Sequence, residues 1–505
     1  MIATPTVNLK SFLIDPQTAK LVPEETARRY QLIPLFRIKN TLTIATADPN
    51  NLPAIDEVAH LTGLTVETAV STVAQIEHAI DQIYGSGDAV NDLVKVMDVT
   101  ADDGAGEAVD VREIQRVAEE APLVRLVNAI LLNAIDARAS DIHIEPVKDR
   151  VRVRLRVDGV LRETDSLPRR LLLPIVARVK ILSNLDIIER RKPQDGRIAI
   201  GVRGREVDLR VSTFPSHQGE KVVIRILDHS AGLQPLEKIG FAPHVLHQFQ
   251  ELIHRPHGVF LVTGPTGSGK TSTLYAALGA INTPQINIIT LEDPVEYQLA
   301  GITQGQVNAR VGLTFADGLR AILRQDPNII FVGEIRDGET ARIAIQASLT
   351  GHLVFSTLHT NDAPSTVTRL IDLGVEPFLI GSSLLGVLAQ RLVRRICQDC
   401  REETTADPVL AEALHLPPEL LTARFYRGRG CDTCGQTRYR GRTGLFELMT
   451  FPEEVRALIL QRASTDALRE AAVTHGLQTL RADGLTKAAA GLTTLTEVLR
   501  VTQES

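Results

Sequence analysis

A glycine-rich segment at residues 264–271 has the residue types and the spacing that are needed to hold a nucleotide. Its sequence, GPTGSGKT, fits G-x-x-x-x-G-K-[ST] at every fixed position. Glycines let the loop curl so that backbone N–H groups face phosphate oxygens, Lys270 brings a positive charge to the outer phosphates, and the Thr271 hydroxyl can bind Mg²⁺. The expected contacts to the nucleotide come from Gly264, Pro265, Thr266, Gly267, Ser268, Gly269, Lys270, Thr271 and Ser272.

Carboxylates and histidines stand next to three further apolar runs of the same region. Glu334 follows one run after a single glycine, where it could lie beside Mg²⁺ or accept a proton from the water that attacks the γ-phosphate. Glu292 and Asp293 follow another run, and either could hold the metal through its waters. His352 and His359 flank the third, and His359 could hydrogen-bond the γ-phosphate. We therefore treat Glu334, Glu292 and His359 as candidate catalytic residues, and Asp293 and His352 as candidates for nucleotide binding.

Two arginines lie on expected strands earlier in the chain. Arg210 is on the polar face of an alternating strand, and Arg225 interrupts the apolar run at 222–227. An arginine within an apolar run is costly unless its guanidinium finds a partner. Both could be ordinary surface or ion-paired residues. Because the planar guanidinium suits phosphate well, we also consider that both reach the nucleotide during catalysis.

The four cysteines of the chain form two C-x-x-C pairs, Cys397 with Cys400 and Cys431 with Cys434. Two such pairs fit a tetrahedral zinc site, and free thiols or a redox pair are the alternatives. No open ligand position is evident, so the zinc is expected to be structural.

Arginines surround the first cysteine pair, and the chain as a whole is slightly acidic. We interpret the arginines as a solvated basic face, which could also meet acidic phospholipid headgroups. The net charge of −6 gives no electrostatic reason to expect nucleic acid as a partner. The sequence has no apolar run long enough to span a membrane and no secretory signal, so we expect a cytoplasmic protein. The arginines in question are Arg391, Arg394, Arg395 and Arg401.

The candidate residues are placed by an alternation of strands and helices over residues 240–395. This pattern predicts an α/β fold, a doubly wound parallel sheet with helices on its faces. In such sheets ligands bind outside the carboxyl ends of the strands, which is where the candidate residues fall. Buried strands are expected at 259–262, 286–291, 328–332 and 353–357.

The remainder of the 505 residues divides into smaller parts, in agreement with the three or four domains that this length predicts. We expect an N-terminal α/β module at 1–85 and an acidic linker at 86–112, which allows a short helix at 90–97. An α+β domain with two hairpins is expected at 113–230, after a helix that Ser140 and Asp141 end. A Cys₄ zinc subdomain at 396–446 and a helical region at 447–505 follow the nucleotide-binding domain.

Several long motifs, in order along nearly the whole chain, resemble those of the secretion ATPases of bacterial type II secretion and type IV pilus assembly. The segment ITLEDPVEY resembles the aspartate box of the family, LRQDPNIIFVGEIRD its Walker B region, and TGH with HTND its histidine box. ASDIHIE, PQDGR and RVSTFP match as well. These segments begin at residues 289, 323, 350, 359, 139, 193 and 210, respectively.

This resemblance implies a RecA-like ATPase that assembles as a homohexamer on the cytoplasmic face of the inner membrane. It would dock on membrane platform proteins and convert ATP hydrolysis into movement of a pseudopilus or pilus. Glu334 matches the catalytic glutamate of the family, and Arg210 and Arg225 match arginines that approach nucleotide. Residues 306–315 and the Cys₄ region are more similar to the type II secretion branch, with a pilus extension or retraction ATPase as the alternative.

Two positions depart from the pattern of the family. Asn328 stands where the family usually has aspartate, so an acceptor is kept and a charge is lost. This change favours a third interpretation, a nucleotide-gated scaffold with little turnover. Residues 33–83 resemble the second half of a domain that binds cyclic di-GMP in some relatives. An R-L-G-x-x-L repeat is missing ahead of them, and we therefore expect this module to bind a protein partner and not a cyclic dinucleotide.

Overall fold

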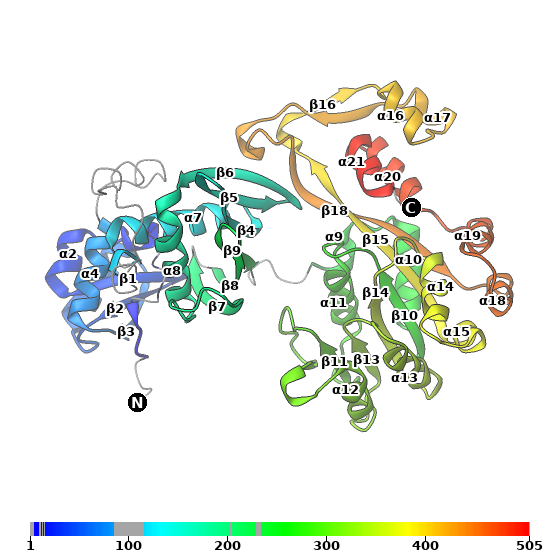
Figure 1. Ribbon diagram of the computed structural model, residues 1–505, viewed down its shortest axis with the longest axis horizontal. Coiled ribbons are helices and arrows are strands. Elements are labelled where there is room, and N and C mark those ends of the chain that lie inside the picture. The colour runs from blue at the N-terminus through cyan, green and yellow to red at the C-terminus, as the bar shows by residue number, and fades with distance from the viewer. Residues whose placement is uncertain are drawn as a thin grey trace. The chain divides into compact units, whose positions relative to one another are not determined.

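The computed structural model describes residues 5–9, 12, 14, 16–84, 116–118, 120–202, 205–228 and 234–503 (Figure 1). The chain divides into two compact units, Met1–Gly232 and Leu233–Ser505. The expected linker at 86–112, with its short helix at 90–97, and the turn residues 203–204 lie outside the described residues.

The first unit begins with a three-stranded sheet of order β1-β2-β3, in which β1 and β2 are antiparallel and β2 and β3 are parallel. The crossover from β2 to β3 runs through α3, where the side chain of Asn51 accepts a hydrogen bond from the Ala54 N–H and so caps the helix. The strands are β1 (Leu32–Ile38), β2 (Thr41–Thr46) and β3 (Thr65–Val70), and the helices are α1 (Pro16–Ala19), α2 (Glu24–Tyr30), α3 (Leu52–Thr62) and α4 (Val73–Tyr84).

The second part of this unit is an antiparallel sheet of order β6-β5-β4-β9-β8-β7. Apolar residues of its strands alternate with polar ones, and they form one core with the apolar sides of α7 and α8. Its elements are α7 (Ala121–Asp136), β4 (Ala139–Pro146), β5 (Arg150–Val157), β6 (Val160–Pro168), α8 (Leu172–Leu182), β7 (Gln194–Val202), β8 (Arg205–Ser216) and β9 (Gly219–Asp228).

Both predicted hairpins of this sheet are present, β5 with β6 and β7 with β8. One expectation is corrected: Ser140 and Asp141 do not end the helix, because α7 ends at Asp136 and both residues already lie in β4. In β4, Ile142 and Ile144 enter the core, and the polar residues between them face the other side of the sheet.

The second unit is built on a sheet of order β12-β11-β13-β14-β10-β15-β18, which is parallel except for β18. Helices cover both faces, with α12, α13, α14, α15, α18 and α19 on one core and α9, α10 and α11 on the other. The doubly wound α/β fold is therefore confirmed. The strands are β10 (Gly258–Thr263), β11 (Ile288–Glu292), β12 (Thr303–Gln306), β13 (Ile329–Val332), β14 (Leu353–Leu358), β15 (Leu384–Ile396) and β18 (Tyr439–Thr450).

Of the helices that connect strands of this sheet, α13 joins the neighbouring strands β13 and β14, whereas α11, α12 and the pair α14 and α15 cross over one or two intervening strands. The helices that cover the sheet are α9 (Leu236–Ile239), α10 (Pro243–Ile253), α11 (Lys270–Ile281), α12 (Phe315–Ile322), α13 (Gly338–Leu349), α14 (Pro364–Asp372), α15 (Pro377–Ser383), α18 (Glu453–Leu460) and α19 (Thr465–Thr474).

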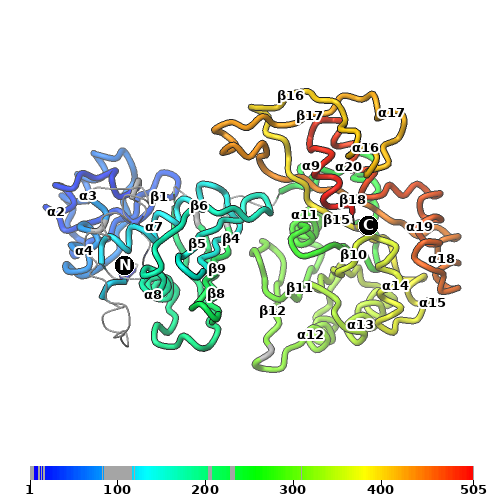
Figure 2. The backbone as a smooth tube through the Cα atoms, turned by 45° about the horizontal axis from the view of Figure 1, so that its top comes forward, coloured from blue at the N-terminus to red at the C-terminus, as the bar shows by residue number. Residues whose placement is uncertain are grey.

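The antiparallel strands β15 and β18 continue past the sheet and carry a small cysteine-containing segment. Apolar residues of this segment form a cluster with α20 and α21, which lie beside it (Figures 1 and 2). Its elements are β16 (Arg401–Thr404), α16 (Pro408–Ala413), α17 (Pro418–Leu421) and β17 (Phe425–Gly428), and the two helices are α20 (Leu480–Ala489) and α21 (Leu495–Thr502).

Buried charged groups join the last helices to the sheet. The Glu447 carboxylate on β18 accepts hydrogen bonds from the backbone N–H of Ala363 and of Leu480, which begins α20. Glu497 on α21 is 1% exposed and pairs with Arg394 of β15 at 2.7 Å. Because a buried charge without its partner is expensive, the pair of Glu497 and Arg394 holds α21 to β15 in one arrangement.

Candidate functional site

The glycine-rich loop lies between β10, whose six residues are all buried, and α11. Gly264, Gly267 and Gly269 have φ angles of 141°, 79° and 90°, which are unfavourable for other residues. A Cβ on Gly264 would also lie 2.5 Å from the Gln390 carbonyl oxygen, and a Cβ on Gly269 would lie 2.8 Å from Gln390 Nε2. The loop therefore needs glycine at these two positions for conformation and for its close approach to β15.

The polar groups of the loop suit a phosphate. Lys270 begins α11, and its Nζ donates to the carbonyl oxygens of Gly264 and Pro265 at 2.7 and 3.2 Å. Burial, together with the charge of Arg391, lowers the pKa of Lys270 to about 8 against the opposing effect of Glu334. The Ser268 hydroxyl oxygen is buried, and the described part of the chain supplies no hydrogen-bond partner for it. With the N-terminus of α11 behind them, these groups fit an anion.

Glu334 and His359 meet at the carboxyl edge of the same sheet, one after β13 and the other after β14. His359 Nε2 lies 3.2 Å from one oxygen of the Glu334 carboxylate, and Arg336 Nη2 donates to the other at 2.7 Å. Burial alone would raise the pKa of Glu334, but the hydrogen bonds and charges of Arg336 and His359 outweigh it and lower that pKa. Glu334 is therefore a carboxylate at neutral pH, oriented by two cationic or polar neighbours.

The two acids at the carboxyl end of β11 differ in exposure, since Glu292 is the last residue of the strand and Asp293 follows it. Glu292 is 3% exposed, and its carboxylate accepts hydrogen bonds from Tyr275, from Thr290 at 2.6 Å and from Gln304 at 3.2 Å. It ties β11 to α11 and β12. The Asp293 side chain is 42% exposed at the edge, 4.0 Å from Arg336. Of the pair, Asp293 is the one whose carboxylate faces the open edge where a hydrated cation would fit.

His352 and Asn328 are not brought to this edge. They stand immediately before β14 and β13, at the amino ends of strands that run parallel to β10. Six residues of strand, about 20 Å, separate this amino edge from the carboxyl edge, which carries the glycine-rich loop at residues 264–271 (the P-loop). His352 bonds through Nδ1 to the Ala347 carbonyl at 2.8 Å, and Asn328 Oδ1 accepts from the Asn287 N–H at 2.7 Å. Both residues therefore serve local structure there.

Arg210 and Arg225 belong to the first unit, where they are direct neighbours in adjacent strands. The register pairs Arg197 with Arg210 and Arg210 with Arg225, so three arginines form a row across β7, β8 and β9. Arg225 Nε lies 3.3 Å from an oxygen of Asp141 on β4. This row lies on the face of the sheet that the helices leave open.

The same face contains a strongly neutralised carboxylate. Glu145 accepts hydrogen bonds from Arg152 and Arg154 and pairs with Lys221 at 2.9 Å. Burial would raise the pKa of Glu145, but the hydrogen bonds and charges of Arg154 and Lys221 lower it to about 2. The ASDIHIE motif thus has a structural explanation in β4: its acids face the arginines, and its isoleucines face the core.

The interpretation of the arginines near the cysteines as a solvated face is wrong for two of them. Arg391 is 6% exposed, and its Nη2 donates to the Asn361 carbonyl at 2.9 Å. Arg394 pairs with the buried Glu497 and lies over the Tyr439 ring at 4.1 Å. Arg401 is half-buried and stacks on Tyr426, and Arg395 is exposed as expected.

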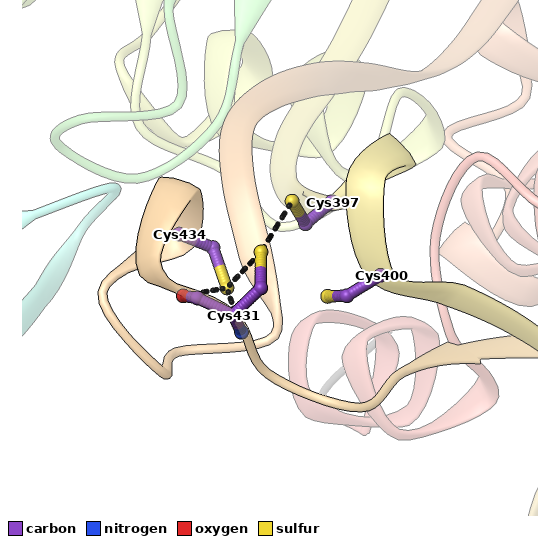
Figure 3. Close-up of side chains that lie close together, drawn as sticks. All are labelled: Cys397, Cys400, Cys431 and Cys434. Atoms are coloured by element: carbon purple, nitrogen blue, oxygen red, sulfur yellow. Dashed lines mark hydrogen bonds between the residues drawn. The ribbon is translucent and has the colours of Figure 1, made fainter.

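The four cysteine sulfurs come together at the end of the β15–β18 ribbon (Figure 3). All four Sγ atoms lie within 4.8 Å of one another. The Cys397–Cys431 and Cys431–Cys434 separations are 3.8 and 3.7 Å, and tetrahedral zinc with bonds of about 2.3 Å implies about 3.8 Å between sulfurs. Backbone N–H groups of Gly430 and Cys431 point at Cys400 Sγ and Cys434 Sγ. The cluster therefore fits a structural zinc ion.

Sequence reasoning missed several residues that touch the P-loop edge. Tyr275 and Arg336 contact the two candidate acids, and Gln390 packs against the loop itself. For Gln390 a signal was present, since it is a polar residue within the apolar run LLGVLAQ. Tyr275 and Arg336 carry no such signal.

In the described ranges, no helix combines the length and the apolarity that crossing a membrane requires.

Comparisons with known proteins agree on one family. Residues 116–500 match the family model described as type II/IV secretion system protein, and residues 2–90 match the MshEN domain. The chain is 46% identical over 499 residues to the type IV pilus assembly ATPase PilB of Myxococcus xanthus, covering 98% of this chain and 88% of that protein. It is 45% identical over 497 residues to the type II secretion system ATPase E of Vibrio cholerae, covering 97% and 98%.

A solved structure is similar as well. The pilus retraction motor PilT with bound ADP is 28% identical, with a TM-score of 0.51, and the likeness covers 74% of this chain and 96% of that one. The ATPase DotB of Legionella pneumophila, 22% identical with a TM-score of 0.54, has the same fold.

Proposed function

The chain belongs to the type II/IV secretion system protein family and is an ATPase of secretion or pilus assembly, and on this premise we propose that it is the motor of a type II secretion system. The observation that carries the proposal is the convergence of Lys270, Glu334 and His359 on one edge of the parallel sheet. Such an edge can bind a phosphate at the N-terminus of α11, next to a carboxylate.

Each residue of this edge has a chemical role in the proposal. The backbone N–H groups of residues 264–272 and the Lys270 ammonium bind the phosphates, and Thr271 and Asp293 hold the Mg²⁺ that neutralises charge on them. Glu334 accepts a proton from the attacking water, for which its lowered pKa keeps it ionised. His359, whose ring contacts Glu334, hydrogen-bonds the γ-phosphate in this proposal and so reports hydrolysis. Glu292 supports this edge from within the core.

We propose that Arg210 and Arg225, which belong to the first unit, also act in hydrolysis. Three arginines in register on neighbouring strands concentrate positive charge on this face, and the Arg225–Asp141 pair offsets part of it. The planar guanidinium is suited to a phosphate. We therefore assign to both arginines the stabilisation of the charge that develops on the transferred phosphoryl group.

The proposal includes assembly and location. We infer that the chain works as a homohexamer on the cytoplasmic face of the inner membrane, docked on platform proteins, and drives assembly of a pseudopilus. The fit of the zinc cluster and the near-complete coverage of the Vibrio cholerae ATPase support the secretion branch. The Myxococcus xanthus relative, similar in identity and coverage, supports pilus assembly as the second candidate.

The scaffold interpretation loses the support that Asn328 gave it. That residue bonds to Asn287 at the amino edge of the sheet, so the loss of charge there lies away from the residues proposed to bind phosphate and metal.

The N-terminal module is a match to the MshEN domain, and binding of a protein partner in place of a cyclic dinucleotide stays a prediction. Calorimetric titration of the full chain with cyclic di-GMP tests it, and binding in the micromolar range would contradict it.

The proposed function is tested in the strain that carries the gene. Deletion should abolish secretion of type II substrates into the medium, and the wild-type gene should restore it, but Lys270→Ala should not. Loss of surface pili with normal secretion would assign the chain to pilus assembly instead. Purified wild-type protein should hydrolyse ATP in the presence of Mg²⁺, and turnover no greater than that of Lys270→Ala would contradict the motor.

A further inference from the structure

Two consecutive polar residues, Gln390 and Arg391, lie in the buried strand β15 beside the P-loop. Their side chains are 1% and 6% exposed. The register pairs Thr263, the last residue of β10, with Ala389, so the next two residues of β15 are level with the loop that follows β10. Side chains of consecutive strand residues point to opposite faces of a sheet. The pair therefore reaches into both layers of the fold from one point beside the site.

Gln390 holds the loop and the first turn of α11. Its Oε1 accepts a hydrogen bond of 2.8 Å from the hydroxyl of Thr273, which is fully buried. Its carbonyl oxygen and its Nε2 occupy the space next to Gly264 and Gly269, where neither glycine could carry a Cβ. Gln390 thus contacts the loop at two glycines and the helix that bears Lys270 at its N-terminus.

Arg391 holds the loop after β14 on the other face. Its Nη2 donates to the Asn361 carbonyl at 2.9 Å and to Asn361 Oδ1 at 3.3 Å, and its Nη1 donates to the Gln390 carbonyl at 3.2 Å. Asn361 lies two residues after His359, whose ring contacts Glu334. The planar fork of the guanidinium makes these bonds in a fixed direction, which an ammonium group cannot do.

We propose that Gln390 and Arg391 are positioning residues for ATP hydrolysis. Gln390 fixes the phosphate-binding loop, and Arg391 fixes the loop after β14 that begins with His359. The proposal rests on the roles assigned above to Lys270, His359 and Glu334. A purely structural pair would lower the stability of the fold and leave the kinetics of the folded fraction unchanged. A positioning pair affects two different kinetic constants, because each residue holds a different part of the site.

The first test replaces the fork of Arg391. Arg391→Met keeps the apolar stem and should lower kcat about tenfold or more, since a small displacement of a catalytic group costs this much, and it should change the KM for ATP less than about twofold. Arg442→Met, at an exposed position of β18, is the matched control and should keep wild-type constants. If Arg391→Met does not fold, Arg391→Lys replaces it, with kcat expected to fall at least about threefold because the two bonds to Asn361 are not both replaced.

The second test breaks the bond between Gln390 and Thr273. Gln390→Leu and Thr273→Val should each weaken binding of a fluorescent ATP analogue about fivefold, with a smaller change in kcat. In the double variant the loss should be the same as in either single variant, because both remove one interaction. Losses that add would show that the bond is not the cause. Thermal unfolding of each variant establishes that the compared protein is folded.

The outcomes separate this inference from the proposed function. Wild-type protein without Mg²⁺-dependent turnover would contradict the motor itself. Wild-type turnover together with an Arg391→Met kcat within about twofold of the Arg442→Met control would overturn the positioning role and leave the motor intact. Equal losses of kcat and ATP affinity in the Gln390 and Arg391 variants would also overturn it, because the two residues are proposed to hold different parts of the site.

Discussion

The two large sheets of this chain present reactive side chains in different ways. In the antiparallel sheet of the first unit, one face is core and the other carries charged residues along the length of the strands. In the parallel sheet of the second unit both faces are covered, and the candidate residues occupy the carboxyl ends of the strands. A face supplies charges in rows that neutralise or repel one another, and an edge brings a few groups of different chemistry to one point.

This difference predicts different sensitivities to substitution. Each edge residue has a separate role that no neighbour duplicates, so its loss should remove hydrolysis. Arg210 and Arg225 have arginine neighbours in register on the same face, so replacing either one alone should lower turnover less.

Lys270→Ala should have the largest effect. The ammonium is the positive charge closest to the expected phosphates, and α11 begins at this residue. We expect turnover to fall at least about 1000-fold, or about 4 kcal/mol of transition-state stabilisation, together with weak ATP binding. Turnover is measured by phosphate release, with Lys238→Ala, on α9, as the control. Substantial turnover in Lys270→Ala would break the assignment of the site to this edge.

Glu334→Gln should separate binding from hydrolysis. The amide keeps the size of the side chain but cannot accept the proton of the attacking water, so turnover should fall about 100-fold or more. ATP affinity should stay near that of the wild type, because Lys270 and the loop are unchanged. Binding is measured with a fluorescent analogue and turnover by phosphate release. Near-normal turnover would rule out Glu334 as the essential base.

Arg210→Ala and Arg225→Ala should each lower turnover about tenfold or more, about 1.4 kcal/mol, with a smaller loss of ATP affinity. The effect is below that of Lys270→Ala because neighbouring arginines remain on the face. Near-normal turnover in the proposed homohexamer would make the substituted arginine structural. Rescue on mixing with Lys270→Ala protein would place the contact between subunits, and absence of rescue would favour a contact within one chain.

The contrast between edge and face also explains what the sequence could reveal. Strand-end motifs are readable because a buried apolar run predicts where the strand stops, and parallel strands bring their ends to one edge. This logic led to the proposal of Lys270, Glu334 and His359, and the structure brings the last two within 3.2 Å of each other. It also misplaced His352, because a residue just before a strand lies near its motif in sequence but at the other edge in space.

Other contacts left no signal that could be read from one sequence. Glu447 and Glu497 look like surface acids of an amphipathic segment, and each is buried because its partners come from distant parts of the chain. Arg391 looked solvated because it stands in an arginine-rich run, and its burial depends on the loop at Asn361. Long-range pairing of polar groups depends on tertiary packing, which local patterns do not encode.

Removal of zinc should have little effect on the P-loop edge. We expect about one zinc ion per chain by metal analysis, held by the four sulfurs. Replacing Cys431 and Cys434 with serine should loosen the segment around β16 and β17 and should increase its proteolysis. Turnover should fall less than about threefold, because no cysteine contacts the loop. Protein purified without chelators and free of zinc would contradict the zinc site.

Asn328→Asp should have the smallest effect, although it restores the residue that the resembling family usually has. The side chain lies at the amino edge, about 20 Å of strand from the P-loop, and its Oδ1 accepts a hydrogen bond from the Asn287 N–H. A carboxylate can accept the same bond, and the added charge strengthens it. We expect kcat and the KM for ATP to change less than about twofold, with the unfolding free energy raised by about 1 kcal/mol or less. Kinetics and denaturant unfolding of the variant measure these quantities.

The isosteric control is Asn361→Asp. It alters the carboxyl edge next to Arg391 and should change kcat more. A larger kinetic change in Asn328→Asp than in Asn361→Asp would show that the amino edge takes part in turnover, and the carboxyl edge would then no longer account for the chemistry of this sheet.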